Sequence, residues 1–452
     1  MATHDENWSD ATKQVHAGYR SGVPQNTAVV PIYQSSAYEF ESFQAASDIF
    51  ALKATGNLYS RTGNPTNAAL EARVASLDRG VAALATGSGQ SAVALSLLAL
   101  VRGGQHIVAS SHLYGGSVDL LDDTFADFGI AVTFVDPHDP GAWQRAIRPN
   151  TRAFFVESIG NPTATIPDLE TLAGIAHDND IPFVVDNTIA TPALLRPIDF
   201  GADVVVYSAT KFLGGHGNSL AGVIVDAGTF NFGARPERWT QFTEPSPRFG
   251  GITFWKEFGA HRSAYLAYTK AKLSHDLGPA LSPFNAFLIL QGIETLDIRL
   301  RKHTDSALEV ARFLDGHPGV SVVHHPGLES HRDHDAARKY LPEGTGSVFA
   351  FDLAAPESAV GPFIDSLRLF SLVANIGDVR SLVVHPATTT HSRFTAEKRA
   401  AAGITLTTIR LSVGLESPAD LIADLSNALD GITAPEPANP QTVTTAPEEL
   451  LV

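Results

Sequence analysis

The sequence predicts a doubly wound α/β protein with a second, smaller α/β unit towards its carboxyl end. Three features of the 452 residues support this prediction. Short apolar or β-branched runs recur without polar alternation, which is typical of parallel strands buried on both faces. Segments with helical spacing of apolar residues lie between these runs. The 37 glycines and 27 prolines supply the tight turns that such an alternation of elements requires.

The first part of the chain is predicted to form an arm and then a large domain. Residues 1–65 are the arm, polar at the start and turn-rich towards its end. Residues 66–300 are the large domain, with predicted helices over Ala68–Leu77 and Ala92–Val101. Because functional groups gather at the carboxyl ends of such strands, the residues that follow each strand matter most. The predicted strands are Ala82–Thr86, His106–Ala109, Ala131–Val135, Ala153–Glu157, Phe183–Asp186 and Val204–Tyr207.

The pattern changes after residue 230. Asn231–Leu273 is a long excursion rich in proline, glycine and aromatic residues, and Leu281–Arg301 is predicted to be one helix. Residues 301–432 are predicted to form the second α/β domain, and residues 433–452 a disordered tail that has little to bury. The strands predicted in this domain are Val320–His324, Gly346–Asp352, Leu382–His385 and Ile409–Val413.

Composition excludes several kinds of function. The net charge of −16 argues against nonspecific binding of nucleic acid or of an anionic membrane. The chain has no cysteine, which excludes disulfides and thiolate metal sites. No apolar stretch reaches the roughly 20 residues of a membrane span, and no targeting signal is present, so we expect a cytoplasmic protein. The histidines between His324 and His334 are interpreted as a solvated loop, and no metal site is expected.

The most informative segment is VVVYSATKFLGGHG, residues 204–217. It places Lys211 just after a predicted buried strand, although an arbitrary lysine is more often a surface charge. Partial burial lowers the pKa of an ammonium group, and only the neutral amine attacks an aldehyde to form a Schiff base. The hydroxyl groups of Ser208 and Thr210 would then point at a phosphate held beside that lysine.

Asp186 ends the apolar strand Phe183–Asp186, upstream of Lys211. A carboxylate in that place could simply cap the next helix. Together with Lys211, it fits a partner for the protonated pyridine nitrogen of pyridoxal 5′-phosphate (PLP), the contact that makes PLP an electron sink. Glu157, at the end of another predicted strand, is interpreted as structural.

Three further segments fit the same ligand. ATGSGQSA (85–92) lies between a strand and a helix, where backbone N–H groups and the helix dipole bind anions. It matches neither G-x-G-x-x-G nor the P-loop pattern, which argues against dinucleotides and nucleoside triphosphates. Tyr114 is followed by two glycines, which leave its ring room to lie against a flat cofactor. Arg410 lies inside an apolar strand, and a buried arginine requires an anion such as an α-carboxylate.

These segments together resemble the Cys/Met-metabolism family of fold-type I PLP-dependent enzymes, the cystathionine γ-synthase-like group. The resemblance covers residues 12–431 and rests on TKQVHAGYR, YSRTGNPT, HLYGGS, ESIGNPT, VVDNT, SATKFLGGHG and RLSVGLE, in that order. It implies the PLP-dependent transferase fold: a large domain with a mostly parallel sheet between helices, a smaller C-terminal α/β domain and an N-terminal arm.

The resemblance also implies a role for each candidate residue. Lys211 would bind PLP covalently and then move protons, and Tyr114 would stack on the ring and assist as a second acid or base. Tyr59 and Arg61 would reach the phosphate of a neighbouring subunit's cofactor, within a homotetramer built as a dimer of dimers. The implied cofactor-binding set is Lys211, Asp186, Tyr114, Gly89, Gln90, Ser208, Thr210, Tyr59, Arg61 and Asn161. The implied substrate-binding set is Arg410, Ser381 and Asn161.

Four segments resemble the branch of this family that acts on O-acetyl-L-homoserine. They are GHGNSLAG, the excursion over residues 231–273, SPFNAFLILQGIETL and NIGDVRSLVVHPATTTHS. The implied reaction is γ-replacement in methionine biosynthesis: O-acetyl-L-homoserine and sulfide give L-homocysteine and acetate, with O-acetylserine or methanethiol as further substrates.

Other activities of the same scaffold stay open. They are cystathionine γ-synthase, O-succinylhomoserine sulfhydrylase and cystathionine or methionine γ-lyase activity. The absence of cysteine after Tyr114 argues against a methionine γ-lyase. A PLP-binding regulator without turnover would not need the complete set of Lys211, Asp186, Tyr114 and Arg410. A nucleotide-binding oxidoreductase is disfavoured by the spacing of the glycines.

Overall fold

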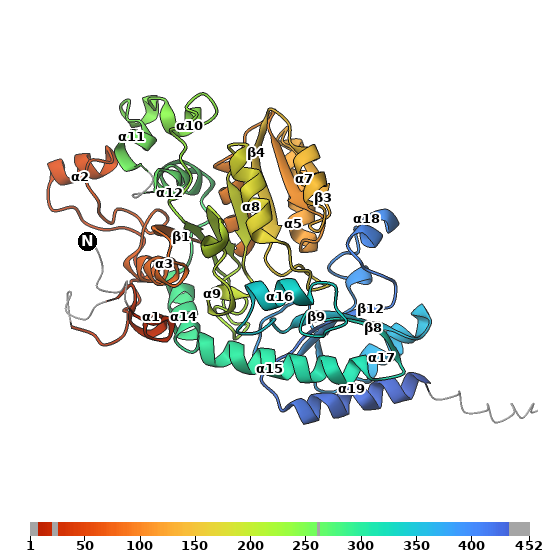
Figure 1. The fold of residues 1–452 in the computed structure, drawn as a ribbon. Helices are drawn as coiled ribbons and strands as arrows, with labels where there is room; N and C mark the ends of the chain where they lie inside the picture. The colour runs from red at the N-terminus through yellow and green to blue at the C-terminus, as the bar shows by residue number, and fades with distance from the viewer. Residues whose placement is uncertain (1–7, 20–25, 260–262, 434–452) are drawn as a thin grey trace, which may run out of the picture.

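The computed structural model describes residues 8–19, 26–259 and 263–433, and these residues contain two β-sheets covered by helices (Figure 1). The larger sheet has seven strands in the order β1-β7-β6-β5-β4-β2-β3. Its strands are β1 (Ala82–Thr86), β2 (His106–Ser110), β3 (Ala131–Val135), β4 (Thr151–Glu157), β5 (Phe183–Asp186), β6 (Val204–Tyr207) and β7 (Gly222–Asp226).

The larger sheet is mostly parallel, as the sequence predicts. Strands β6, β5, β4, β2 and β3 run parallel to one another. The sequence analysis missed β7, which lies antiparallel between β1 and β6. The parallel order brings the carboxyl ends of β4 and β5 together, with Glu157 directly opposite Asp186.

Helices bury both faces of this sheet, which explains why its strands lack polar alternation. Successive residues of β4 alternate between the two sides: Ala153 and Phe155 belong to one apolar cluster, Phe154 and Val156 to the other. One face packs on α4 (Gly89–Leu98), α5 (Gly115–Asp119) and α12 (Ala264–Tyr268), the other on α3 (Pro65–Asp78), α8 (Leu169–Asp178) and α14 (Pro283–Glu294). Shorter helices are α6 (Phe125–Asp127), α7 (Pro140–Ala146), α9 (Thr191–Leu194), α10 (Thr240–Thr243), α11 (Phe254–Phe258) and α13 (His275–Leu277).

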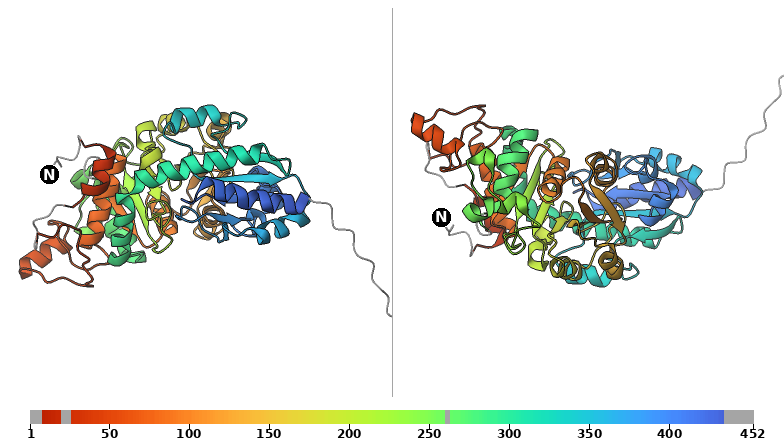
Figure 2. Two further views of the ribbon diagram at one scale, coloured as in Figure 1. Left: turned by 90° about the horizontal axis from the view of Figure 1, so that it is seen from below. Right: turned by 90° about the horizontal axis from the view of Figure 1, so that it is seen from above.

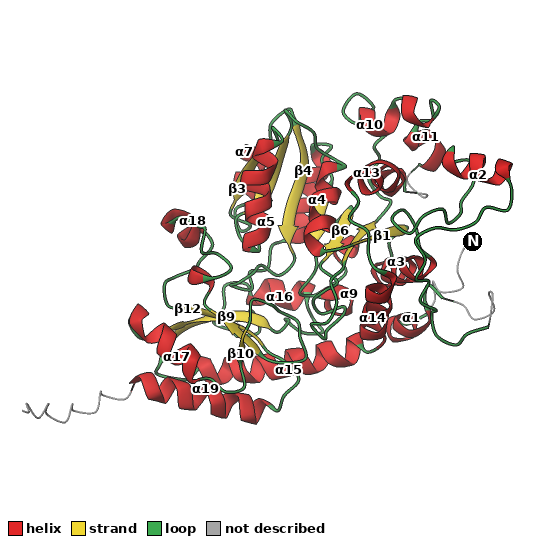
Figure 3. Ribbon diagram, turned by 180° about the vertical axis from the view of Figure 1, so that it is seen from behind, coloured by secondary structure: helices red, strands yellow, loops and turns green. Residues whose placement is uncertain are grey.

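The smaller sheet lies towards the C-terminus and has the order β10-β11-β12-β9-β8. The long helices α15 (Leu296–Asp315) and α19 (Pro418–Thr433) run side by side along it (Figure 3). No helix within the described ranges has the length and apolarity needed to span a membrane. The strands are β8 (Val320–His324), β9 (Val348–Leu353), β10 (Ser371–Leu372), β11 (Leu382–Val384) and β12 (Thr408–Ser412), and the remaining helices are α16 (His334–Tyr340), α17 (Val360–Ser366) and α18 (Ala396–Ala401).

The single helix predicted over Leu281–Arg301 is two helices, which corrects that expectation. Helix α14 ends before Thr295, whose φ of −118° leaves the helical range, and α15 starts immediately after it. Apolar periodicity continues across the break, so the sequence pattern does not reveal it.

Because α15 passes residue 300, the division into domains 1–65, 66–300 and 301–432 stays a prediction. The tail predicted to be disordered lies, from residue 434 on, outside the described residues.

The N-terminal segment has two short helices with different surroundings. Helix α1 (Asp10–His16) packs against α3 and α14, whereas α2 (Phe43–Phe50) lies at one edge of the molecule (Figure 2). Phe43 of α2 is 91% exposed. Phe50 of the same helix is also exposed, and apolar side chains that are exposed together are typical of a surface that contacts another molecule.

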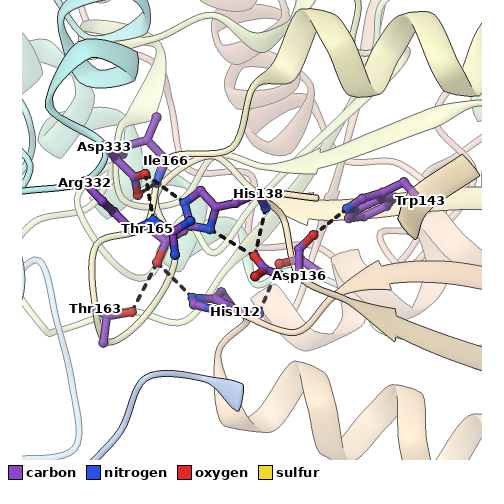
Figure 4. A network of polar contacts seen from close by, with 10 residues as sticks. His112, Asp136, His138, Trp143, Thr163, Thr165, Ile166, Arg332 and Asp333 are labelled. Atoms are coloured by element: carbon purple, nitrogen blue, oxygen red, sulfur yellow. Dashed lines mark hydrogen bonds and ion pairs between the residues drawn. The ribbon is translucent and has the colours of Figure 1, made fainter. Parts of the chain in front are cut away.

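A polar network links the segment after β3 to the segment between β8 and α16 (Figure 4). His138, which follows β3, contacts Asp333 (2.8 Å) and Asp136 (3.0 Å), and Asp333 accepts a hydrogen bond from the amide of Ile166 (2.9 Å). Burial opposes the charged form of His138, but the bonds to both carboxylates outweigh it and raise its pKa. The neighbouring His325 is buried against Phe349, so the expectation that this segment is a solvated loop was wrong for that residue.

Candidate active site

One cavity lies at the carboxyl ends of β4 and β5 and at the turn after β6. A loop of the smaller sheet, residues 374–376, forms another part of its wall. This is the position that parallel α/β topology predicts for a ligand site. Nine residues that the sequence analysis singled out line the cavity: Gly89, Gln90, Tyr114, Asn161, Asp186, Ser208, Thr210, Lys211 and Arg410.

Lys211 projects from the turn that follows β6. Its amide donates to the carbonyl of Ser208 (3.0 Å), and its own carbonyl accepts from the amide of Gly215 (2.7 Å), so the turn is fixed on both sides. Burial and the positive charge of Arg410 lower the pKa of Lys211 to about 8. About a tenth of this amine is therefore neutral and nucleophilic at pH 7, a far larger fraction than for an exposed lysine.

Two carboxyl groups face each other across neighbouring strands. Asp186 ends β5, accepts the amide of Thr188 (2.9 Å) and has a pKa that burial raises to about 6. Glu157 ends β4 and accepts the amides of Tyr114 (2.6 Å) and Asn161 (3.2 Å). Burial and the nearby charge of Asp186 raise the pKa of Glu157 well above its usual range. A cationic group bound between them would stabilise the ionised form of Asp186.

The amino end of α4 and the turn after β6 form an anion cradle. Ser88 caps α4 by accepting the amide of Ser91 (3.1 Å), which leaves the first amides of the helix directed at the cavity. A Cβ atom on Gly89 would lie 2.5 Å from the Cβ of Ser208, so only glycine permits this approach. With the hydroxyl groups of Ser208 and Thr210, this end of the cavity offers the donors that a phosphate requires.

Tyr114 lies at the start of α5, is 41% exposed and lines the cavity. A Cβ atom on Gly116 would lie 2.6 Å from this ring, and one on Gly115 would lie 2.0 Å from the carbonyl oxygen of Thr390. Gly116 thus gives the ring its room, and Gly115 permits the close approach of the Thr390 backbone. A flat aromatic ligand can stack on it.

Arg410 reaches the cavity from β12 of the smaller sheet. Its side chain donates to Asn161 Oδ1 (3.1 Å) and to the carbonyl of Asn375 (3.0 Å). Among the described residues no hydrogen-bond partner is found for its buried Nε, and burial lowers its pKa to about 10. A buried guanidinium group bound only by neutral oxygens favours an anionic ligand, and a carboxylate suits its geometry.

Three predicted residues lie outside the cavity wall. The Oγ of Ser381 donates to Glu416 (2.8 Å) and accepts from the amide of Gly414 (2.9 Å). Arg61 donates to the carbonyl of His275, and its guanidinium group lies over the ring of Tyr59 (5.5 Å). The substrate-binding role of Ser381 and the role of the other two towards a second subunit stay predictions.

The sequence analysis did not single out several residues of the cavity. Asn375, from the loop that follows β10, accepts a hydrogen bond from Lys211, and Thr188 fixes Asp186. Glu157 holds backbone groups of the cavity wall, consistent with the structural role expected for it, yet it also lines the cavity. Asn375 is the first residue of the segment NIGDVRSLVVHPATTTHS, but that pattern does not reveal the contact with Lys211, which only the packing of the two sheets creates.

The residues present fit PLP. The anion cradle can bind its phosphate, and Asp186 can pair with its pyridine nitrogen. The Tyr114 ring can stack on its ring, and the amine of Lys211 can react with its aldehyde. The described residues contain no group of three or more histidine, aspartate or glutamate side chains that could bind a metal ion. The donor set thus favours an organic phosphate cofactor that is bound through an amine.

Comparisons with known proteins agree with this assignment. The pattern of the family described as Cys/Met metabolism PLP-dependent enzymes matches residues 11–430. The O-acetyl-L-homoserine sulfhydrylase of Leptospira meyeri is 44% identical over 433 residues, which cover 94% of this chain and 98% of that protein.

Solved structures are similar over almost the whole chain. A putative O-acetylhomoserine (thiol)-lyase of Campylobacter jejuni, which carries an N′-pyridoxyl-lysine-5′-monophosphate, has a TM-score of 0.90 and 36% identity, covering 94% of this chain and all of that one. A cystathionine gamma synthase of Xanthomonas oryzae pv. oryzae has a TM-score of 0.80 and 33% identity, covering 94% and 98%.

Proposed function

This chain belongs to the Cys/Met metabolism family of PLP-dependent enzymes, and from that membership we propose that it makes L-homocysteine and acetate from O-acetyl-L-homoserine and sulfide. The observation that carries the proposal is one cavity that holds a lysine of lowered pKa, a buried carboxyl group and a buried arginine. The lysine can transfer protons, the carboxyl group can pair with a protonated ring nitrogen, and the arginine can bind the carboxylate of an amino acid.

Each residue has a defined task in this reaction. PLP, when bound, supplies an electron sink that acidifies the Cα proton of an amino acid. Arg410 binds the α-carboxylate of the substrate and so places Cα towards Lys211. The neutral Nζ of Lys211 removes the Cα proton, would pass it on to the bound cofactor and, neutral again, removes a Cβ proton, which allows acetate to leave from Cγ. Sulfide adds at Cγ, and Lys211 returns the protons to Cβ and Cα.

The cavity favours an acetyl ester over a succinyl ester. Among the described residues that line it, the cationic side chains are Lys211 and Arg410. Lys211 serves as the base and Arg410 binds the α-carboxylate. A succinyl group carries a second carboxylate, for which this chain leaves no cation in the cavity, and an unpaired buried charge is costly.

We propose a homotetramer, built as a dimer of dimers, as the active form. Tyr59 and Arg61 would then complete the phosphate site of the adjacent subunit, which is supported by their position outside this chain's own cavity. The exposed face of α2 supports a contact of this arm with a second copy. We also propose a cytoplasmic location, because the substrates are intermediates of amino-acid metabolism.

A comparison of homoserine esters tests this function. The purified protein is assayed with sulfide and O-acetyl-, O-succinyl- or O-phospho-L-homoserine, and L-homocysteine is quantified. We expect kcat/KM for the acetyl ester to be at least about tenfold higher than for the other two, which corresponds to about 1.4 kcal/mol. Lys302→Ala, on the exposed side of α15, should match the unmodified protein.

Three results would contradict the proposal. A preference for the succinyl ester would indicate a different branch of the family. Formation of cystathionine when cysteine replaces sulfide, at a higher rate than homocysteine forms, would indicate a γ-synthase. A complete lack of product from all three esters would favour a PLP-binding protein without turnover.

A further inference from the structure

The geometry points to Asn375 as a residue that positions the amine of Lys211 for proton transfer and links it to Arg410. This inference rests on the proposed function, since it concerns the base of that reaction. Asn375 belongs to the loop that joins β10 to β11 in the smaller sheet, whereas Lys211 belongs to the larger one. The base and its partner thus come from opposite sides of the cavity.

The contact itself is direct. The Nζ of Lys211 donates to Oδ1 of Asn375 at 2.5 Å, and among the described residues this is its hydrogen-bond partner. A hydrogen bond from a charged ammonium donor is stronger than one from a neutral amine. Asn375 therefore stabilises the protonated amine, which is the form that Lys211 takes after each proton removal.

The loop that carries Asn375 is fixed against the lysine turn. The amide of Gly377 donates to the Oγ of Ser412 (2.9 Å), and the amide of Val379 donates to the carbonyl of Gly215 (3.0 Å). Gly377 has a φ of +71°, and a Cβ atom there would lie 2.8 Å from the amide nitrogen of Phe212. Only glycine allows the loop to approach the residue after Lys211 this closely.

The same residue also contacts Arg410. The backbone carbonyl of Asn375 accepts Nη2 of Arg410 at 3.0 Å, while its side chain accepts Lys211. The amine that moves the proton and the guanidinium group that binds the carboxylate are therefore held by one residue. This fixes the position of Nζ relative to the Cα of a substrate that is bound by its carboxylate.

The chemistry of the acceptor matters because the amine must change its charge. The charged and titratable groups that surround it are the guanidinium group of Arg410, the carboxyl groups of Asp186 and Glu157, and the phenol of Tyr114. A neutral amide oxygen orients the ammonium group without the strong stabilisation that a further carboxylate would give. Lys211 can thus release its proton again.

Two substitutions give opposite predictions. In Asn375→Ala the charged amine loses its acceptor, so the pKa of Lys211 falls. In Asn375→Asp a negative charge replaces the amide oxygen, so the pKa rises. The backbone carbonyl that holds Arg410 is present in both variants.

The test is competitive acetylation of the full chain after PLP has been removed, which requires no turnover. Trace acetic anhydride is added between pH 6 and 11, and the labelling of the Lys211 peptide is measured by mass spectrometry. We expect the midpoint of labelling against pH to shift down by about 0.5 pH unit or more in Asn375→Ala and up in Asn375→Asp. Asn150→Ala, at the opposite end of β4, should match the unmodified chain.

Activity provides a second readout. With PLP restored, Asn375→Ala should lower kcat about tenfold or more, while the KM for the amino-acid substrate changes less than about threefold. A midpoint that is unchanged or raised in Asn375→Ala would overturn the inference, since general loosening of the cavity exposes the amine and raises its pKa. Failure of the unmodified enzyme to make homocysteine would contradict the proposed function but leave the labelling result intact.

Discussion

At the scale of single residues, the state of Lys211 decides what the cavity can do. Burial and the charge of Arg410 lower the pKa of its amine to about 8. The neutral amine is the reactive form, and its fraction increases with pH until the solution is well above that pKa. At its pKa half of the amine is neutral, and an exposed lysine would be half neutral only near pH 10.4.

Uptake of PLP by the cofactor-free protein should therefore follow the ionisation of this amine. We expect the second-order rate constant to rise with pH and to level off with a midpoint of about 8. The uptake is followed by visible absorbance, and the same series with Nα-acetyl-lysine corrects for the ionisation of PLP itself. A midpoint near 10 would show that Lys211 is not desolvated as described.

Most of the site residues could be predicted from the sequence because their motifs are local. Asp186 ends a strand, Lys211 lies in the turn after a strand and Gly89 begins a helix, and such positions are visible as a change of pattern along the chain. Asn375 and the pairing of Glu157 with Asp186 could not be found in this way. Those contacts depend on how distant segments pack, and no local pattern encodes that.

At the scale of elements, α15 holds the lysine turn in place. The guanidinium group of Arg299 is buried and donates to the carbonyls of Phe212 (2.9 Å) and Gly292 (2.7 Å). Phe212 directly follows Lys211, and Gly292 lies in α14. One side chain thus ties two helices to the turn that carries the base.

Arg299→Met should destabilise the protein because it leaves buried carbonyl groups without donors. We expect the free energy of unfolding to fall by about 2–4 kcal/mol, measured by denaturant titration. Arg301→Ala, on the same helix, breaks only an exposed ion pair with Asp297 and should change it by less than about 1 kcal/mol. Equal effects of the two variants would contradict this role of Arg299.

The strands were easier to predict than the helix boundaries. Runs such as Phe183–Asp186 and Val204–Tyr207 coincide with β5 and β6, because strands that are buried on both faces must be apolar throughout. The break between α14 and α15 and the strand β7 were missed. The local sequence at Thr295 carries no distinctive signal, whereas β7 (GVIVD) has the same apolar, β-branched run as the predicted strands and could have been predicted from it.

At the scale of the whole molecule, each active site is proposed to need two chains. Tyr59 and Arg61 lie outside the cavity of their own chain, while the anion cradle lies inside it. If a partner supplies these residues, a chain that lacks Lys211 can still complete the site of another chain. The arrangement predicts complementation between two inactive variants.

Lys211→Ala and Arg61→Ala should each have low activity, and mixtures should recover part of it. In a hybrid dimer one site contains both defects and the other contains neither. Random reassembly of equal amounts makes half of the dimers hybrid, so activity should approach about a quarter of that of the unmodified enzyme. The activity is measured after denaturation and joint refolding; if it did not exceed the sum of the separate variants, the shared site would be wrong.

The central claim is that Lys211 forms the covalent attachment to PLP, and borohydride reduction tests it most directly. The yellow protein is reduced and digested, and its peptides are mapped by mass spectrometry. The claim predicts a pyridoxyl phosphate group on the Lys211 peptide, and a colourless, unlabelled protein for Lys211→Ala. A label on another lysine, or a yellow Lys211→Ala protein that borohydride still labels, would contradict it.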